Sequence, residues 1–90
     1  MAQAIVDPEE LRRFASNLKR FNGELSHGMG VLHGQLQNLG DTWRDQEHVK
    51  FVQEFEQTLA VMQRYVEAAN LHIPFLMRKA QRVEEYLQQK

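Results

Sequence analysis

The chain of 90 residues contains no cysteine, two prolines and a single tryptophan. Without cysteine it can form no disulfide and offers no thiolate for catalysis or metal binding. Its 11 basic and 12 acidic residues nearly cancel, so it lacks the basic surface that nucleic-acid binding requires. It also lacks the apolar run of about 18 residues that a membrane-spanning helix needs. Its first six residues have neither the basic start nor the apolar core of a secretory signal peptide.

The residues that are present fit a small folded domain. Hydrophobic residues make up 42% and charged residues 26% of the chain, a balance that argues against disorder. We expect residues 1–90 to form a single domain. A chain of this length buries a modest fraction of its surface and is only marginally stable alone, so we expect a partner on physical grounds.

A helix start signal precedes a long amphipathic stretch in the first half. Asp7 can cap a helix, Pro8 suits the first helical position, and Glu10 follows three residues after the cap. This pattern predicts a helix over residues 8–39. Its apolar residues recur at spacings of three or four, the period of one helical face: Leu11, Phe14, Leu18, Phe21, Leu25, Met29, Leu32, Leu36 and Leu39.

Glycines interrupt the second half of this helical pattern. Gly23, Gly28, Gly30 and Gly34 each cost about 1 kcal/mol relative to alanine in a helix. Two interpretations stay open. The segment is either a weak, bendable helix held by its partners, or a place where the backbone of another helix approaches closely.

Turn chemistry interrupts the helical pattern at the middle of the chain. Gly40 can end the first helix in a left-handed conformation, and Asp41 or Thr42 can cap the next helix. Trp43 follows directly. We therefore expect a corner at residues 40–43, where Trp43 covers the end of the core, presents its indole to a partner, or does both.

The apolar pattern of the second half predicts another long helix, over about residues 43–89. Phe51, Tyr65 and Tyr86 lie beside its apolar stripe and widen it, which favours packing against more than one helix. Pro74 removes a backbone hydrogen bond inside the helix, and because the heptads continue in register we expect a kink and not a break. The stripe alternates spacings of three and four: Val52, Phe55, Leu59, Met62, Val66, Ala69, Ile73, Leu76, Ala80, Val83 and Leu87.

Together these elements predict an all-α protein, an antiparallel hairpin of two helices. If the hairpin folds about residues 41 and 42, residue 74 lies opposite residue 9 and the rest of the second helix overhangs. An apolar face without an internal partner is a candidate interface, and we expect another hairpin to cover it in a four-helix bundle. The candidate interface residues on this overhang are Phe75, Leu76, Met77, Val83, Tyr86 and Leu87.

Residues that could carry chemistry are sparse. No catalytic triad, phosphate-binding loop or HExxH motif occurs, so we predict no enzyme and no catalytic or cofactor-binding residue. Glu24 and His27 have the Glu-x-x-His spacing of di-iron bundle proteins, and Glu47 or Glu54 could complete such a site in a dimer. Glu24 and His27 flank the outward side of the stripe, whereas such ligands face inward. A bundle metalloprotein is therefore a minor alternative, and no metal ligand is predicted.

A short constellation surrounds the corner, with Leu39, then Trp43, then the aromatic Phe51 eight residues after the tryptophan. With the chain length and the two helical arms, this pattern resembles the WXG family, the ESAT-like helical hairpins that are substrates of type VII secretion. The family's glycine two positions after the tryptophan is Asp45 here. An aspartate is compatible with the first turn of a helix, where the helix dipole favours negative charge.

The resemblance also implies a mode of action. It implies a homodimer or heterodimer of hairpins in a four-helix bundle that acts by protein–protein contact and is secreted without a signal peptide. The family's tail signal, a tyrosine with an acidic residue four positions later, is missing, since Tyr86 has Lys90 at that spacing. That departure and Asp45 favour the alternative, a cytosolic helical adaptor or chaperone that binds another helical protein.

Overall fold

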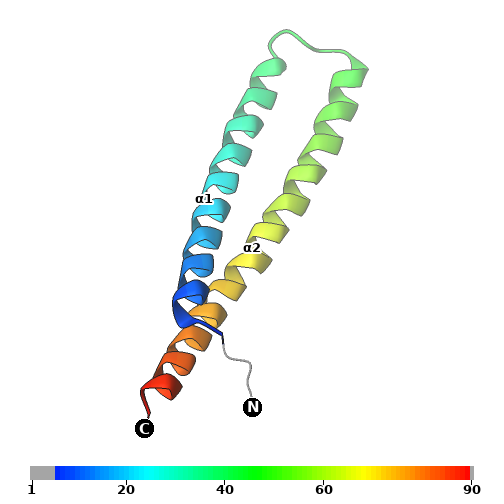
Figure 1. The fold of residues 1–90 in the computed structure, drawn as a ribbon. Helices are drawn as coiled ribbons and strands as arrows, with labels where there is room; N and C mark the ends of the chain where they lie inside the picture. Colours follow the sequence, from blue (N-terminus) through cyan, green and yellow to red (C-terminus); the bar gives the residue numbers. More distant parts are fainter. Residues whose placement is uncertain (1–5, 90) are drawn as a thin grey trace.

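The computed structural model describes residues 6–89 and consists of two long helices joined by a short corner (Figure 1). Helix α1 spans Pro8–Leu39 and helix α2 spans Gln46–Gln88. The arms run antiparallel, so the predicted all-α hairpin is confirmed. Expectations that fall on residues 1–5 and on residue 90 lie outside the described residues, and a single domain over residues 1–90 stays a prediction.

Helix α1 begins with the cap that the sequence predicts. The Asp7 backbone is extended, and its Oδ1 accepts a hydrogen bond from the Glu9 N–H at 2.9 Å. Pro8 occupies the first turn, where its missing N–H costs nothing. Glu9 and Glu10 add negative charge at the positive end of the helix dipole. The start of α1 is therefore encoded locally.

The end of α1 differs from the expectation. Gly40 has φ −62° and ψ −16°, a right-handed conformation, so the predicted left-handed glycine is wrong. The last turn tightens instead. The Gly40 N–H donates to the Gln37 carbonyl, and the Asp41 N–H donates to the Asn38 carbonyl, both at 3.1 Å. Bonds across three residues satisfy carbonyls that a left-handed cap would otherwise satisfy.

Helix α2 starts later than predicted, at Gln46 and not near residue 43. Its cap is Asp45, where the sequence suggested Asp41 or Thr42. Residues 40–42 form turns that continue α1, whereas Asp45 has the extended backbone of a cap, with φ −90° and ψ −178°. The corner thus covers residues 40–45, and Trp43 lies within it, ahead of the helix.

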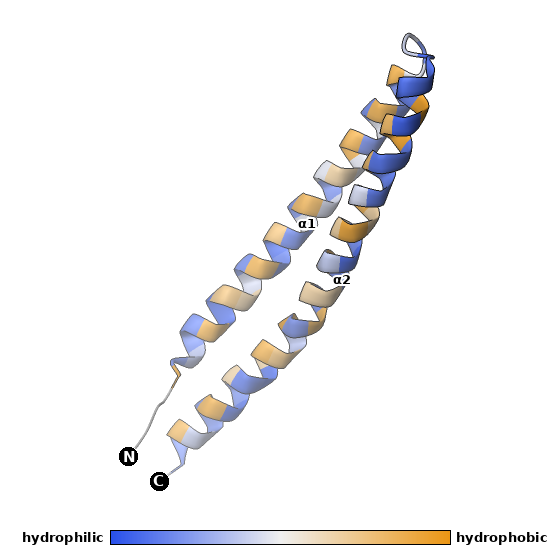
Figure 2. Ribbon diagram, turned by 90° about the vertical axis from the view of Figure 1, so that its right-hand side faces the viewer, coloured by the Kyte–Doolittle hydropathy of each residue, from blue (hydrophilic) through white to orange (hydrophobic). Residues whose placement is uncertain are grey.

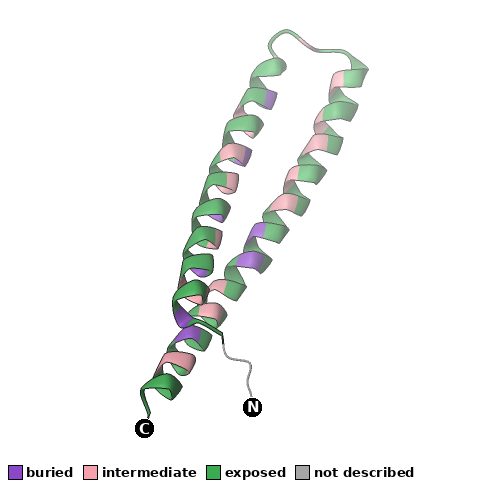
Figure 3. Cartoon of the chain, viewed as in Figure 1, coloured by how far each residue is buried: buried purple, intermediate pink, exposed green. Residues whose placement is uncertain are grey.

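The two helices pack along one line of contact, which we call the seam (Figure 3). The buried positions that α1 contributes to the seam repeat every seven residues. The predicted stripe of α2 matches this seam, since each member except Leu87 is buried or half-buried. In α1 the prediction is partly wrong, because Phe14, Phe21, Leu32 and Leu39 are 57%, 52%, 47% and 44% exposed. The stripe of α1 is wider than one neighbouring helix can cover. The buried residues of α1 are Pro8, Ala15, Asn22, Met29 and Leu36.

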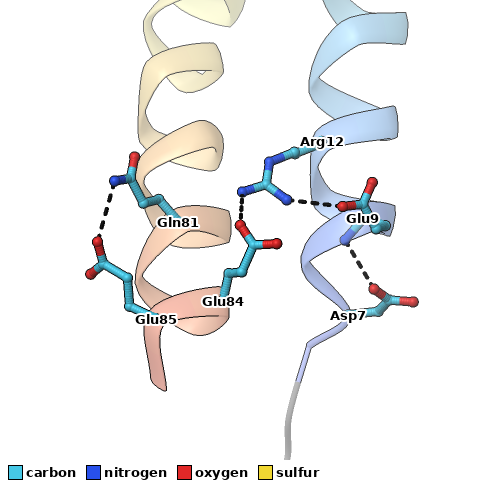
Figure 4. A network of polar contacts seen from close by, with 6 residues as sticks. All are labelled: Asp7, Glu9, Arg12, Gln81, Glu84 and Glu85. Atoms are coloured by element: carbon cyan, nitrogen blue, oxygen red, sulfur yellow. Dashed lines mark hydrogen bonds and ion pairs between the residues drawn. The ribbon is translucent and has the colours of Figure 1, made fainter. Parts of the chain in front are cut away.

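Two polar contacts show the register of the arms. The Arg12 Nη2 contacts the Glu84 Oε1 at 2.6 Å (Figure 4), and the Asn22 Nδ2 donates to the Asn70 Oδ1 at 2.9 Å. Pro74 lies between these two contacts, so the predicted overhang that starts at Pro74 is wrong. The corner also extends to residue 45 instead of 43.

Helix α2 runs through Pro74 without a break, as the continuous heptads predict. Pro74 has no N–H to bond the Asn70 carbonyl, but it lies on an exposed side of the helix, where water can take that place. The glycines of α1 face open space too. A Cβ atom added at residue 23, 28, 30 or 34 would meet no atom of α2 within 4 Å, so α2 is not the helix that approaches them.

The hairpin is long and thin, with extents of 70 × 18 × 14 Å. Its radius of gyration is 20.4 Å, whereas a compact domain of this length has about 12 Å. Apart from Pro8, the apolar side chains that the described part of the chain buries come from six residues, three of them alanines. Neither helix within residues 6–89 has an apolar stretch long enough to cross a membrane.

Candidate interaction surface and tryptophan corner

Aromatic rings stack along the corner and the first turns of α2. The Trp43 ring lies 5.0 Å from the His48 ring and 5.7 Å from the Phe51 ring, centroid to centroid. Phe51 in turn stacks on Phe55 at 5.6 Å. Pairs of this kind contribute about 0.5–1.5 kcal/mol beyond their buried area. Trp43 is half-buried, so part of its indole stays accessible.

Two hydrogen bonds join the corner to the helix ends. The Asp45 Oδ1 accepts from the His48 N–H at 3.0 Å, and the Arg44 Nε donates to the Gly40 carbonyl at 3.2 Å. A Cβ atom at Gly40 would lie 3.2 Å from the Gln37 carbonyl oxygen and 3.6 Å from His48 Cε1. Gly40 is therefore suited to this corner by its size. His48 was missed by the sequence analysis, since a histidine in a first helical turn carries no motif.

Replacing Asp45 with alanine should lower the free energy of unfolding by about 1 kcal/mol, because the His48 N–H loses its side-chain acceptor. Asp45→Gly, which creates the Trp-x-Gly motif of the family, should cost only a few tenths of a kcal/mol. Urea denaturation followed by circular dichroism measures both. Asp41→Ala is the control, since Asp41 is exposed and caps nothing. Equal losses in Asp45→Ala and Asp41→Ala would contradict the capping role.

Two apolar hollows open on one side of the hairpin. The first, about 470 Å³, lies between Phe14 and Leu18 of α1 and Tyr65 and Phe75 of α2. The second, about 300 Å³, lies nearer the corner. Both lie on the same side, since Leu18 and Leu32 are two heptads apart in α1 and Phe55 and Leu76 are three heptads apart in α2. We call this side the aromatic face, defined by Phe14, Leu18, Leu32, Leu39, Phe51, Phe55, Tyr65 and Phe75.

The opposite side of the seam is polar, and we call it the ion-pair face. It carries the Arg12–Glu84 contact and, nearer the corner, a contact of 3.2 Å between His33 Nε2 and Glu56 Oε2. Arg12 also reaches Glu9 at 3.1 Å (Figure 4), and the hydrogen bond to Glu84 raises the pKa of the Arg12 guanidinium. Figure 2 shows the resulting alternation of hydrophobic and hydrophilic residues along both helices. The hairpin is thus amphipathic across its width.

The structure divides the predicted interface residues between these two sides and the seam. Phe75 is 51% exposed and borders the larger hollow of the aromatic face. Leu76 lines the same hollow from a half-buried position. Val83, one heptad later, is half-buried at the seam. Of these three residues, only Phe75 is exposed in the single chain.

The remaining three predicted interface residues do not share one side of α2. Tyr86 is 66% exposed. It lies three heptads after Tyr65, so it is on the same side of α2 as the aromatic face. Met77 is 43% exposed but lies one heptad before Glu84, on the ion-pair face. Leu87 is 49% exposed at the end of α2. The sequence pattern grouped these residues because they are neighbours along the chain.

The candidate metal ligands do not gather. Glu24 and His27 are both exposed on α1, and Glu47 and Glu54 are exposed on α2. Within residues 6–89 no three histidine or carboxylate side chains lie close enough to hold a metal ion together. No observation on the described residues therefore favours the metalloprotein alternative.

The fold and the aromatic face define a class of protein, the small two-helix hairpin whose apolar surface lies on one side. A family model, WXG100, described as proteins of 100 residues with WXG, matches residues 3–86. The chain belongs to the WXG100 family. The predicted family resemblance is confirmed, and the family match points to no enzyme class.

Solved structures agree with the family match. Selenomethionine-labelled EsxB, a secreted protein from Bacillus anthracis strain Sterne, superposes with a TM-score of 0.80 at 31% identity, over 96% of this chain and 98% of that chain. Wild-type EsxB from the same strain has a TM-score of 0.79 at 32% identity, over 93% and 97%. No curated protein sequence matches the chain.

Proposed function

We propose that this protein is a type VII secreted or secretion-associated protein that acts by protein–protein contact, as a dimer of hairpins in a four-helix bundle. The observation that carries the proposal is the aromatic face, an apolar surface along the whole hairpin that the chain itself leaves uncovered. Phe14, Tyr65 and Phe75 on that face are 57%, 54% and 51% exposed. The family membership and the likeness to the secreted protein EsxB support the secretion part.

The exposed area supports the dimer. The hairpin exposes 7022 Å², whereas a compact monomer of its mass exposes about 5,500 Å². The difference of about 1,500 Å² is in the range that each subunit of an obligate dimer covers. A partner that covers the aromatic face would therefore give the hairpin the buried core that two helices alone cannot supply.

The chemistry of the face supports a second copy of this chain as the partner. Neither apolar hollow is lined by an aspartate, glutamate, lysine or arginine, so self-pairing brings no like charges together. The chain as a whole has a net charge of −1, which adds little repulsion between two copies. A heterodimer with a similar hairpin is the other outcome that the experiment below distinguishes.

Within this proposal the corner is the family's motif region, formed by Gly40, Trp43, Asp45 and Phe51. Asp45 stands where the family has glycine, and its side chain caps α2. The half-buried Trp43 stacks on Phe51 and leaves part of its indole for a partner. A rigid, capped corner with an accessible indole is suited to recognition by secretion machinery.

Fractionation of the native culture tests the proposal, with a cytosolic marker to control for lysis and strains whose type VII system is intact or disabled. We expect the protein in the medium without the marker, only when the system is intact. Phe75→Glu, which disrupts the aromatic face, should stay in the cell, while Met77→Glu on the ion-pair face should be exported. Native mass spectrometry of the exported species separates a homodimer from a heterodimer.

A second candidate is a cytosolic helical adaptor, favoured by Asp45 in place of the motif glycine and by Lys90 in place of the tail acid. Protein confined to the cytosol in both strains would overturn the secretion proposal and support the adaptor. The hairpin would then use the same aromatic face on an intracellular helical partner.

A further inference from the structure

A single polar residue lies at the centre of the seam. Asn22 is the third of the five buried positions that α1 repeats every seven residues, and it is 2% exposed. Its Nδ2 donates to the Asn70 Oδ1 at 2.9 Å. Among the described residues its own Oδ1 is buried without a hydrogen-bond partner. Asn22 is also the one buried polar side chain within residues 6–89.

Asparagine is a costly choice for this position. Its neighbours in the repeat are Ala15 and Met29, and an apolar residue between them would bury no amide. A buried carbonyl oxygen without a donor loses its hydration and regains no bond. The residue therefore needs an explanation other than the stability of the seam.

The seam itself does not define a unique register. The apolar positions of both helices repeat every seven residues, so sliding α2 by one heptad again sets apolar positions against apolar positions, although the sizes of the side chains differ. A slide of one heptad in either direction leaves seven residues of one helix without a partner at the corner, and residues 40–45 are long enough to span the offset of about 10 Å. The glycine-containing end of α1 has a low helix propensity and can lengthen the corner further.

Asn22 opposes the slide of α2 toward the corner. After a slide of one heptad, Asn22 faces Met77 in place of Asn70, and its amide loses its hydrogen bond inside the seam. The same loss applies when the arms of two chains exchange in a slipped register. We propose that the Asn22–Asn70 pair selects the register in which the arms pack, and thereby the closed hairpin over slipped or arm-exchanged assemblies. This inference rests on the seam alone and is independent of what covers the aromatic face.

Engineered cysteine pairs report the register, because the natural chain contains no cysteine. The Arg12–Glu84 and Asn22–Asn70 contacts place Ala15 opposite Ala80, so Ala15→Cys with Ala80→Cys reports the native register. Ala15→Cys with Leu87→Cys reports the register slipped by one heptad. With Asn22 present, we expect the first pair to form its disulfide and the second to remain reduced under mild oxidation.

Asn22→Leu should raise the unfolding midpoint and, at the same time, increase the slipped disulfide at least tenfold. Native mass spectrometry of the cysteine-free Asn22→Leu chain should show additional assemblies. Asn17→Leu is the matched control, since Asn17 is exposed on the same helix and should leave the disulfide pattern unchanged. A native disulfide alone, with one assembly, in Asn22→Leu would overturn the inference.

Variants of Asn70 keep the test valid if Asn22→Leu fails to fold, because Asn70 is exposed and its replacement leaves the seam packing in place. Asn70→Leu removes the acceptor and should increase the slipped disulfide. Asn70→Asp retains an acceptor oxygen for the Asn22 Nδ2 and should preserve the native register. Equal disulfide patterns in Asn70→Leu and Asn70→Asp would show that the hydrogen bond does not select the register.

Discussion

Replacing Phe75 with glutamate is expected to dissociate the proposed dimer while leaving the hairpin folded. Phe75 is 51% exposed in the single chain and borders the larger hollow of the aromatic face, so a partner would bury its remaining surface. Glutamate loses that apolar burial and places an unpaired carboxylate in the interface. Together these effects should cost about 3 kcal/mol or more of binding free energy. The dissociation constant of the dimer should therefore rise about a hundredfold.

Sedimentation equilibrium at micromolar concentration measures this effect, as a fall in mass to that of a single chain, 10.6 kDa. Met77→Glu is the matched control. Met77 is 43% exposed, two residues from Phe75 in the same helix, but it lies on the ion-pair face. The two variants thus add the same charge at nearly the same height of the hairpin. A dimer that survives Phe75→Glu, or dissociates equally in Met77→Glu, would show that the aromatic face is not the interface.

Replacing Ala80 with leucine is expected to produce the second large effect, a loss of hairpin stability. Ala80 is 0% exposed, and Ala15, which the register places opposite it, is 1% exposed. Two alanines facing each other leave no space for a longer side chain, so leucine must move the helices apart. Overpacking of this kind costs about 1–3 kcal/mol, and each kcal/mol lowers the unfolding midpoint by about 4–8 °C in a domain of this size.

Thermal unfolding followed by circular dichroism measures the loss. Ala60→Leu is the control, because Ala60 is exposed on α2 and leucine has a helix propensity close to that of alanine. The difference between the two variants isolates packing at the seam from propensity. An Ala80→Leu midpoint equal to that of Ala60→Leu would mean that the helices do not pack tightly at Ala15 and Ala80.

The sequence predicts the two helices more accurately than the corner between them. Gly40 was expected to be left-handed and Asp41 or Thr42 to cap α2, because these residues have the propensities for those roles. The structure instead continues the turns of α1 and uses Asp45, which also has the propensity of a cap. Several residues in one short stretch could serve as caps, and the choice among them depends on how the two arms meet.

The register of the two helices predicted from the sequence is also wrong. It was inferred from a fold about residues 41 and 42, which placed Pro74 opposite the start of α1 and made all later residues an overhang. The Arg12–Glu84 contact shows that α2 stays beside α1 well beyond Pro74. Counting residues outward from the corner does not give the register of the two helices, and the heptad repeat cannot correct it because apolar positions recur.

What the sequence alone determined is local and periodic. The Asp7 cap, the start of α1 at Pro8, the two helices and the family follow from residue propensities, spacings and the tryptophan corner. Only the tertiary structure decided which side of the wide α1 stripe faces α2. It buried Ala15 and Asn22, which no apolar pattern marks, and left Phe14 and Phe21 exposed. Periodicity shows which residues share a helix face, but the neighbour that covers the face is a long-range property.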